Sequence, residues 1–326
     1  MVKLGINIIP NMPAGEVVDL AVGAEALGYE YLILADEGFM QDVYILLGAV
    51  ARETHTMKLA PCTNGYTRHP AVTAAAVASL NDLSGGRAFA TLIAGGSVVL
   101  NPMNIPREAP LSVARDTVEI LRRLWRGERV SYQGKRYGVT DAQISMGNQG
   151  DIPIWIAPRG EKMCLLTGEL ADGALMMVKA DLGEGLELVA QGSQAGGRRP
   201  LRVFLDRIAF TPKMIEDTSR FFPNVVADTP ERQLKGFMTD DQIQSIRAAI
   251  NLSGAEAARQ FITLDMLKGY KIIGTPQECS QTFRQLVDDH QLDVMILNIV
   301  AGGLEQNLAY LNDARRILAE SGRLAA

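Results

Sequence analysis

The sequence predicts a (β/α)8 barrel, the TIM-barrel class of α/β fold, with insertions. Short apolar segments alternate with helical segments along nearly the whole chain of 326 residues, which is typical of parallel strands joined by right-handed helical crossovers. Eight such apolar segments occur, the number that closes this barrel. An open doubly wound sheet is the alternative, but INIIPNMP stands where that fold carries G-x-G-x-x-G after its first strand.

The first hundred residues contain four strand segments separated by helices. The expected strands are residues 3–9, 29–34, 57–61 and 87–95, and the expected helices are residues 15–27, 42–54 and 70–84. The first helix ends at Gly28, and the third begins at Pro70, a residue favoured in the first helical turn. Because each of these strands is joined to the next by a helix, the strands are expected to be parallel.

The second half of the chain continues this alternation of strands and helices, with two interruptions. Residues 112–127 predict a long helix, and residues 130–139 a hairpin that turns at Gln133-Gly134. Further strands are expected at 151–157, 172–178, 201–210 and 293–300, and further helices at 160–171, 274–290 and 304–321. Residues 211–267 read as mostly helical. We therefore expect one domain over residues 1–326, with insertions at about 97–150 and 211–267.

Composition excludes several classes of function. The chain is 47% hydrophobic and 21% charged, which is ordinary for a globular protein with a large core. Its net charge is −5 and no basic run stands out, which argues against nucleic acid as a partner. No apolar run approaches the ~18–20 residues that span a membrane, and no basic leader precedes the first strand. The cysteines and histidines are too scattered for disulfides or a metal site, so we expect a cytoplasmic protein without a metal.

The residues just past the predicted strands are the candidate site, because barrel enzymes place their chemistry at the carboxyl ends of the strands. They are Asn7, Asp36, Glu37, Pro61, Cys62, Thr63, Asn64, Gly95, Gly96, Ser97, Ala157, Pro158, Arg159 and Gly160. This rim has no Ser-His-Asp set and no cluster of metal ligands. It suits a flat polar cofactor held by main-chain groups, although the glycines also fit a role in tight turns alone.

Six segments carry a resemblance to a known family. They are LGINIIPNMP, ADEG, NGYTRHPAVTAAAVASLNDLSGGRA, LRRLWRGERVSYQGKRY, PIWIAPRGEKMCLLTGELADGAL and IIGTPQEC. Together they resemble the bacterial-luciferase-like superfamily, and within it the coenzyme F420-dependent methylenetetrahydromethanopterin reductases. The resemblance implies a luciferase-like barrel and an oxidoreductase that binds coenzyme F420 or FMN at the barrel mouth. It also implies a small-molecule substrate and a homodimer.

The resemblance also implies roles for individual residues by position. Asp36 and Glu37 lie where the family has an Asp-His pair beside the ring. Residues 61–63 lie at a bulge where the family often has a non-prolyl cis peptide against the ring, and residues 95–97 lie near the ring edge and ribityl chain. Residues 157–160 lie at the phosphate loop, where a helix start offers free N–H groups and Arg159 adds a forked donor.

Two residues depart from the reductases. Glu37 replaces the usual His, and a carboxylate there would serve as proton donor or acceptor if the apolar mouth raised its pKa. The alternative is a solvated or ion-paired Glu37. Asn7 replaces a Glu and has no titratable proton, so pterin reduction by the reductase mechanism is not expected, although an amide still hydrogen-bonds a substrate. Asp36 either caps the following helix or accepts a hydrogen bond from the ring or substrate.

Three functions follow, in order of preference. The first is hydride transfer between reduced coenzyme F420 and a small organic substrate. The second is an FMN-dependent monooxygenase that uses dioxygen. The third is a non-catalytic binding protein of the same fold, which the departures at Asn7 and Glu37 would fit. The substrate itself has no readable signature in the sequence.

Overall fold

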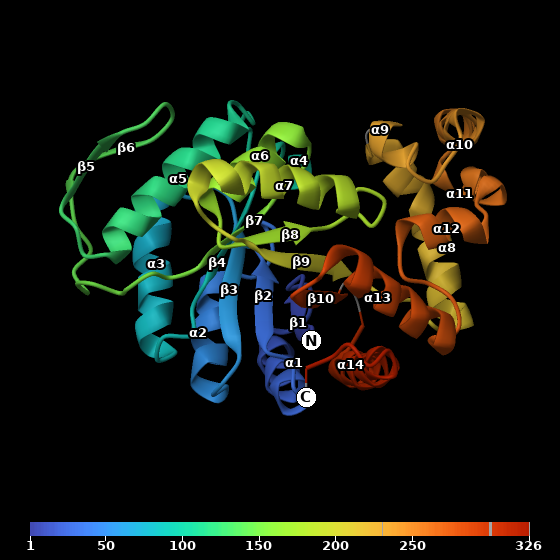
Figure 1. Cartoon of the computed structure of the whole chain (residues 1–326), viewed down its shortest axis with the longest axis horizontal. Coiled ribbons are helices and arrows are strands. Elements are labelled where there is room, and N and C mark those ends of the chain that lie inside the picture. Colours follow the sequence, from blue (N-terminus) through green and yellow to red (C-terminus); the bar gives the residue numbers. More distant parts are fainter. Residues whose placement is uncertain (230, 300–301, 326) are drawn as a thin grey trace.

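Eight parallel strands close into a barrel in the order β1-β10-β9-β8-β7-β4-β3-β2 (Figure 1). The structure is a computed structural model that describes residues 1–229, 231–299 and 302–325. The strands are β1 (Lys3–Ile8), β2 (Tyr31–Ala35), β3 (Lys58–Thr63), β4 (Ala90–Ile93), β7 (Ile154–Ala157), β8 (Gly173–Met176), β9 (Leu201–Asp206) and β10 (Val294–Ile299). Closure confirms the predicted barrel and rules out the open sheet. The last strand was expected to reach Val300, which lies outside the described residues.

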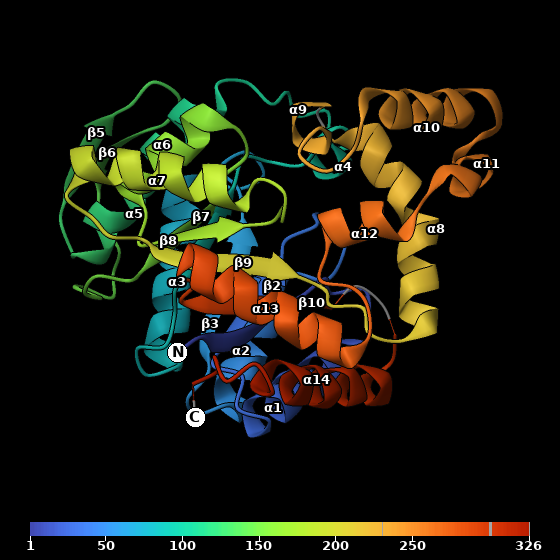
Figure 2. The same cartoon turned by 45° about the vertical axis from the view of Figure 1, so that its right-hand side comes forward.

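Helices surround the barrel (Figures 1 and 2). They are α1 (Ala14–Ala26), α2 (Val43–Glu53), α3 (Pro70–Leu83), α5 (Pro110–Trp125), α6 (Glu161–Leu170), α7 (Leu182–Gly196), α13 (Pro276–His290) and α14 (Leu304–Ala319). Their starts follow local chemistry. The Asp42 carboxylate caps α2 by accepting from the N–H groups of Tyr44 and Ile45 at 2.9 and 3.1 Å, and Thr275 forms a capping box with Glu278 at the start of α13.

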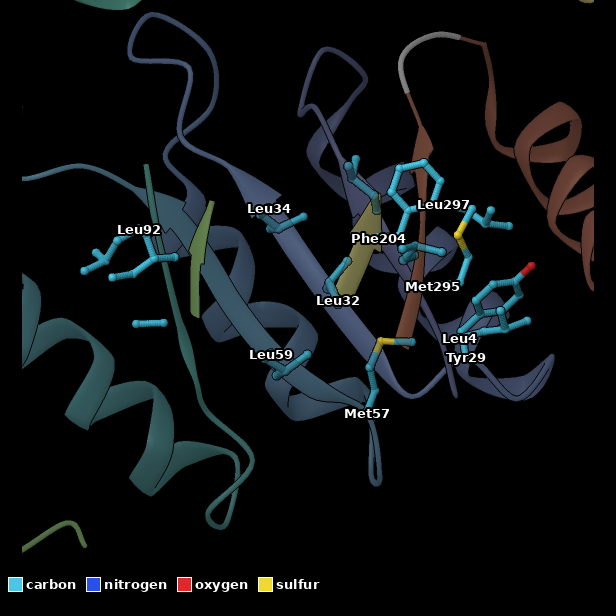
Figure 3. Packing of buried hydrophobic residues seen from close by; sticks show 14 of the residues in the cluster. Leu4, Tyr29, Leu32, Leu34, Met57, Leu59, Leu92, Phe204, Met295 and Leu297 are labelled. Atoms are coloured by element: carbon cyan, nitrogen blue, oxygen red, sulfur yellow. The ribbon is translucent and has the colours of Figure 1, made fainter. Parts of the chain in front are cut away.

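Side chains alternate along each strand between two hydrophobic layers. Leu32 and Leu34 of β2 point outward into the layer between strands and helices, which Figure 3 shows. Tyr31 of the same strand points into the barrel, where its ring lies 5.9 Å from that of Phe89 and 5.1 Å from that of Trp155, measured between centroids. These large rings fill the floor of the barrel.

The inward-facing side chains become small toward the carboxyl ends of the strands. Ala35 follows Tyr31 and Ile33 on the inner face of β2, and Ala157 follows Trp155 on β7. Cys62 packs against the same inner layer from β3. The floor is therefore filled by aromatic rings, and the mouth is lined by small side chains on these three strands.

The insertion between β4 and β7 contains a short helix, the barrel helix α5 and a hairpin. The short helix is α4 (Ser97–Leu100), and the hairpin pairs β5 (Val130–Gln133) antiparallel with β6 (Gly138–Ala142), as predicted. Asp116 of α5 is 2% exposed and holds the hairpin. Its carboxylate accepts from the Tyr132 hydroxyl at 2.8 Å and from the Tyr137 N–H at 3.0 Å.

The second insertion is a group of helices with its own core, which lies to one side of the barrel in both views (Figures 1 and 2). It contains α8 (Pro212–Asp228), α9 (Glu231–Leu234), α10 (Asp240–Ser253), α11 (Ala255–Ala258), the 3-10 helix η1 (Arg259–Phe261) and α12 (Leu264–Tyr270). Phe222, Ile243 and Ile246 are fully buried in this core. The segment ends three residues later than the predicted Leu267, because α12 continues to Tyr270.

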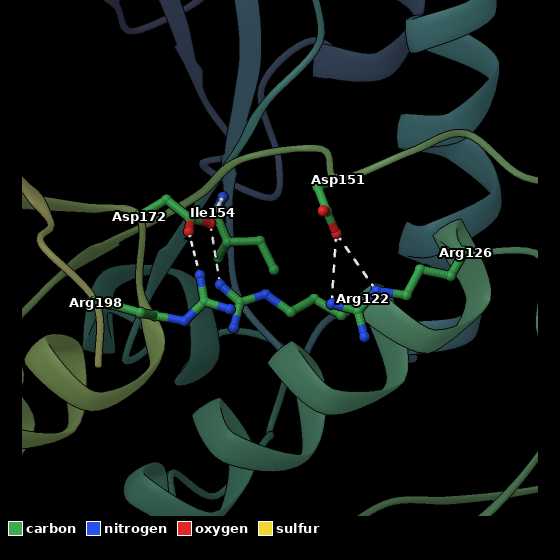
Figure 4. Close-up of polar contacts among 6 residues, drawn as sticks. All are labelled: Arg122, Arg126, Asp151, Ile154, Asp172 and Arg198. Carbon is green, nitrogen blue, oxygen red and sulfur yellow. Dashed lines mark hydrogen bonds and ion pairs between the residues drawn. The ribbon is translucent and has the colours of Figure 1, made fainter. Parts of the chain in front are cut away.

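An ion-pair network lies at the amino-terminal ends of the barrel strands, on the side opposite to the mouth (Figure 4). Asp172, just before β8, accepts from the guanidinium groups of Arg122 at 3.0 Å and of Arg198, and from the N–H of Ile154 at 2.9 Å. Residues at this end of a (β/α)8 barrel contribute to stability rather than chemistry. The network therefore ties α5, β7 and β8 together away from the mouth.

Candidate functional site

The barrel brings the first three groups of predicted residues to one edge. Asn7 lies in β1 beside Ile33 of β2, and Ala35 at the end of β2 lies beside Cys62 of β3. Asp36 follows β2 directly, and its N–H donates to the Cys62 carbonyl at 3.0 Å. The parallel register thus places Asn7, Asp36 and Cys62 around the same part of the mouth.

Asn7 has a partner that was not predicted. Its side-chain N–H donates to the side-chain oxygen of Asn298 at 2.7 Å, across the junction of β1 and β10. Arg207 in turn donates to the Asn298 carbonyl at 3.2 Å and lies over the ring of Tyr310 at 4.6 Å. Asn298 is the one polar residue in the strand VMILNI, which was the available indication of its role.

Asp36 is held by β3 rather than by the helix that follows it. Its carboxylate accepts from the Thr63 hydroxyl at 3.1 Å, and Thr63 is fully buried. The cap of α2 is Asp42, so the capping role considered for Asp36 is wrong. Asp36 is therefore fixed at the mouth by a hydrogen bond from a neighbouring strand.

Glu37 and Cys62 experience an environment that disfavours charge. Burial raises the pKa of Glu37, and the neighbouring Asp36 carboxylate raises it further. Burial, with Glu37 and Asp36 nearby, raises the pKa of the Cys62 thiol to about 12. The thiol is accordingly protonated at neutral pH, and Glu37 keeps its proton to a higher pH than an ordinary glutamate.

The loop after β3 differs in part from the expectation. No peptide bond between described residues is cis, so the cis peptide implied for residues 61–63 is absent. Asn64 is 2% exposed, and its side-chain oxygen accepts from the N–H groups of Tyr66 at 2.8 Å and Thr67 at 3.0 Å. Asn64 thus shapes its own loop, and Pro61 is buried within β3.

Residues 95–97 form a tight turn at the end of β4. Gly95 has a φ of +81°, and a Cβ there would lie 2.8 Å from Leu100, so only glycine fits. The Gly95 carbonyl accepts from Arg107 at 3.2 Å. Gly96 precedes α4, and Ser97 is exposed at its first position.

Residues 157–160 lead from β7 into α6 and leave the start of that helix open. Ala157 and Pro158 are buried, whereas Arg159 and Gly160 are exposed. Gly160 has a φ of +76° and no side chain caps the helix. The N–H groups of the first turn therefore have no capping side chain, and the exposed Arg159 directly precedes the N-cap residue Gly160.

Three lysines near the carboxyl edge were missed by sequence reasoning. Lys179, Lys268 and Lys271 line one pocket between α12, α13 and the loop after β8. Lys271 donates to the carboxylate of Asp206, which is 5% exposed, at 3.3 Å. Burial lowers the pKa of Lys179, and burial raises that of Asp206 against the opposing effect of Lys271. Lys179 directly follows the strand predicted at 172–178, which was the available indication of its place, whereas Lys268 and Lys271 lie outside any predicted strand end.

The described residues contain neither a metal-ligand cluster nor a membrane-spanning helix. Across residues 1–229, 231–299 and 302–325, no group of three His, Cys, Asp or Glu side chains is arranged to hold a metal ion. Within the same ranges, no helix has the length and apolarity needed to cross a membrane.

Known proteins resemble this chain in sequence and in fold. The family model described as luciferase-like monooxygenase matches residues 5–290. The chain is 30% identical over 316 residues to a 5,10-methylenetetrahydromethanopterin reductase of Methanolobus tindarius, covering 91% of this chain and 93% of that protein. It is 28% identical over 278 residues to an F420-dependent glucose-6-phosphate dehydrogenase of Mycolicibacterium fortuitum, covering 76% and 80%. The structure of the coenzyme F420-dependent tetrahydromethanopterin reductase from Methanopyrus kandleri matches with a TM-score of 0.86 at 24% identity, covering 95% of this chain and 97% of that one.

Proposed function

Because the chain belongs to the luciferase-like monooxygenase family, we propose that it is a coenzyme F420-dependent oxidoreductase acting on a small organic substrate. The observation that carries the choice of cofactor is its similarity to two kinds of relative. One is the methylenetetrahydromethanopterin reductase, whose Methanopyrus kandleri counterpart is described as F420-dependent, and the other is the F420-dependent glucose-6-phosphate dehydrogenase. When bound, this cofactor supplies or accepts a hydride.

The mouth and the start of α6 fit such a cofactor. The inward side chains at Ala35, Cys62 and Ala157 are small, and the proposal places the flat ring against them, above the aromatic floor. The uncapped first turn of α6, with Gly160 and Arg159, offers main-chain N–H groups and a guanidinium to a phosphate. The remaining predicted contacts, at Asp36, Pro61, Thr63, Asn64, Gly95, Gly96, Ser97 and Pro158, belong to the same proposal.

Glu37 is the residue we assign to proton transfer. Asn7 has no titratable proton and its amide is paired with Asn298, so it orients a bound group rather than titrating. Glu37 lies beside Asp36, and its raised pKa keeps it protonated where an ordinary glutamate is ionised. Asp36, fixed by Thr63, is then the neighbour that maintains this state.

The assembly and compartment are part of the proposal. Ile45 and Val72 are 75% and 50% exposed on the neighbouring helices α2 and α3. A second copy of the chain covering this face would remove that apolar surface from water, which supports a homodimer. None of the three cysteines, all within the described residues, forms a disulfide, which fits a reducing compartment such as the cytoplasm.

Titration of the purified protein with coenzyme F420 and with FMN, followed by ligand fluorescence, tests the cofactor. We expect saturable binding of coenzyme F420 and much weaker binding of FMN. The reverse preference would favour the monooxygenase, and binding of neither would refute both. Turnover of reduced coenzyme F420 with a panel of carbonyl and imine acceptors then separates an enzyme from a non-catalytic binding protein.

A further inference from the structure

Three arginines line one cavity at the amino-terminal end of the barrel, on the side opposite to the mouth (Figure 4). Arg122 lies on the last turn of α5, Arg126 directly follows α5, and Arg198 lies just beyond the end of α7. The cavity has a volume of about 300 Å³, whereas about 10–15 Å³ suffices for one water molecule. It therefore has room for a small molecule beside the three guanidinium groups.

The carboxylates that line this cavity do not balance the arginines. Within the part of the chain that the structure describes, the acids lining it are Asp151 and Asp172, against three guanidinium groups. Asp172 is shared, because it pairs with both Arg122 and Arg198. The side chain of Asp151 is 86% exposed and lies 3.3 Å from Nε of Arg126, so water screens this pair and it offsets little charge. The cavity therefore carries at least one unbalanced positive charge.

The positive charges gather around the most buried of the three arginines. The side chain of Arg122 is 14% exposed. Burial lowers the pKa of Arg122, and the neighbouring guanidinium groups of Arg198 and Arg126 lower it further, against the opposing effect of Asp172. A guanidinium has five N–H donors, of which one from Arg122 and one from Arg198 reach Asp172. An anion in the cavity would accept from the other donors and offset the excess charge.

We propose that this cavity binds a phosphate group, either as free phosphate or as part of a small metabolite. The forked donors of arginine match the oxygens of phosphate. A tetrahedral dianion accepts hydrogen bonds from several directions, whereas a carboxylate has two oxygens in one plane. Arg122 and Arg126 bind it from the end of α5, and Arg198 binds it from the segment after α7. The site lies away from the mouth, so it does not depend on the proposed cofactor.

Calorimetric titration of the protein with inorganic phosphate at constant ionic strength tests the site. We expect saturable binding that Arg198→Gln weakens at least about tenfold, the loss typical of a hydrogen bond between charged groups. Asp172 keeps Arg122 and the Ile154 N–H as partners in this variant, which is therefore expected to fold. Asp151→Asn removes a competing carboxylate from the cavity and should strengthen binding by about two- to fivefold. A structural role of the arginines alone predicts neither change.

Further titrations locate the anion and identify its source. Arg129→Gln, which breaks an exposed ion pair with Asp141, is the matched control and should bind phosphate as the wild type does. Unchanged affinity in Arg198→Gln would overturn the inference, as would a loss confined to Arg159→Gln, because the anion would then bind at the mouth. Tighter binding of glycerol 3-phosphate than of inorganic phosphate would identify a phosphorylated metabolite, and the reverse would identify the free ion. Binding of neither, or of acetate as tightly as phosphate, would contradict a phosphate site.

Discussion

At the scale of single residues, Glu37 has the environment that matters most for chemistry. Its pKa is raised by burial and by Asp36, so the carboxyl stays protonated above the ordinary glutamate value of about 4.3. If Glu37 donates a proton in turnover, activity is present below the raised pKa and falls as the pH rises through it. We expect Glu37→Gln to lower kcat by at least about 100-fold and to abolish this step in the pH profile.

The same shift predicts a change in stability. Ionising a half-buried Glu37 disfavours the folded state, so its contribution is fully present at low pH and is lost as the pH rises through the folded pKa. Urea unfolding of wild type and Glu37→Gln should therefore diverge in that direction, with the variant gaining relative stability at higher pH. The exposed Glu305→Gln is the control. Parallel pH profiles for Glu37→Gln and wild type would contradict both predictions.

Local residue chemistry was readable from the sequence, whereas distant partners were not. The second strand was predicted to end at Leu34 and ends one residue later, at Ala35, and the helix start predicted at Asp42 is confirmed, with Asp42 as the cap. The partner of Asn7 is 291 residues away along the chain, and Arg207, which donates to the carbonyl of that partner, is 91 residues away from it. Such pairs arise when the barrel closes, so no spacing in a single sequence reveals them.

At the scale of elements, glycines let α6 and α7 approach each other closely. A Cβ on Gly192 would lie 2.0 Å from the Leu165 carbonyl oxygen, and backbone cannot move aside as a side chain can. We expect Gly192→Ala to destabilise the protein by about 1–3 kcal/mol or more. Gly15 in α1 has no atom within 4 Å of such a Cβ, so Gly15→Ala should be neutral or stabilise by up to about 1 kcal/mol. Urea denaturation measures both, and equal effects would contradict this packing.

Asp206, the last residue of β9, contacts the segment that follows α12 and leads from the helical insertion back to the barrel. Its carboxylate accepts from the Ile272 N–H at 2.8 Å and from Lys271 at 3.3 Å. Removing one partner of a buried ion pair costs about 3–5 kcal/mol, because the other charge stays buried. We expect Asp206→Ala to lose stability of that order in chemical denaturation. Asp217→Ala on the exposed face of α8 should lose less than about 1 kcal/mol. A mild Asp206→Ala would show that the insertion is attached by other contacts.

The elements themselves were largely predictable, within a few residues at their ends. The hairpin itself was predicted, but its turn was expected at Gln133-Gly134, whereas Gln133 is the last residue of β5 and pairs with Gly138, so the turn spans residues 134–137. The helices of residues 211–267 were expected only as a helical stretch. Where one of these helices ends and the next begins depends on caps such as Thr239. It also depends on a separate hydrophobic core, whose residues follow no regular spacing in the sequence.

At the scale of the whole molecule, closure of the barrel followed from the repeated strand–helix rhythm, but the position of the insertion did not. Its helices pack through their own core and connect back to the barrel at the bridge between Ala209 and Ile273. We infer that the chain is one domain, because this bridge and the contacts of Asp206 join the helical insertion to the barrel. The same arrangement places Gln233 of α9 in the lining of one pocket together with Arg159 and Gly160.

A crystal structure of the protein soaked with coenzyme F420 tests the central claim most directly. The account predicts density for a tricyclic ring at the barrel mouth, against Cys62 and Ala157, with the phosphate at Gly160 and the start of α6. Density for the ring at another surface, or a mouth that stays empty at saturating ligand, would contradict it.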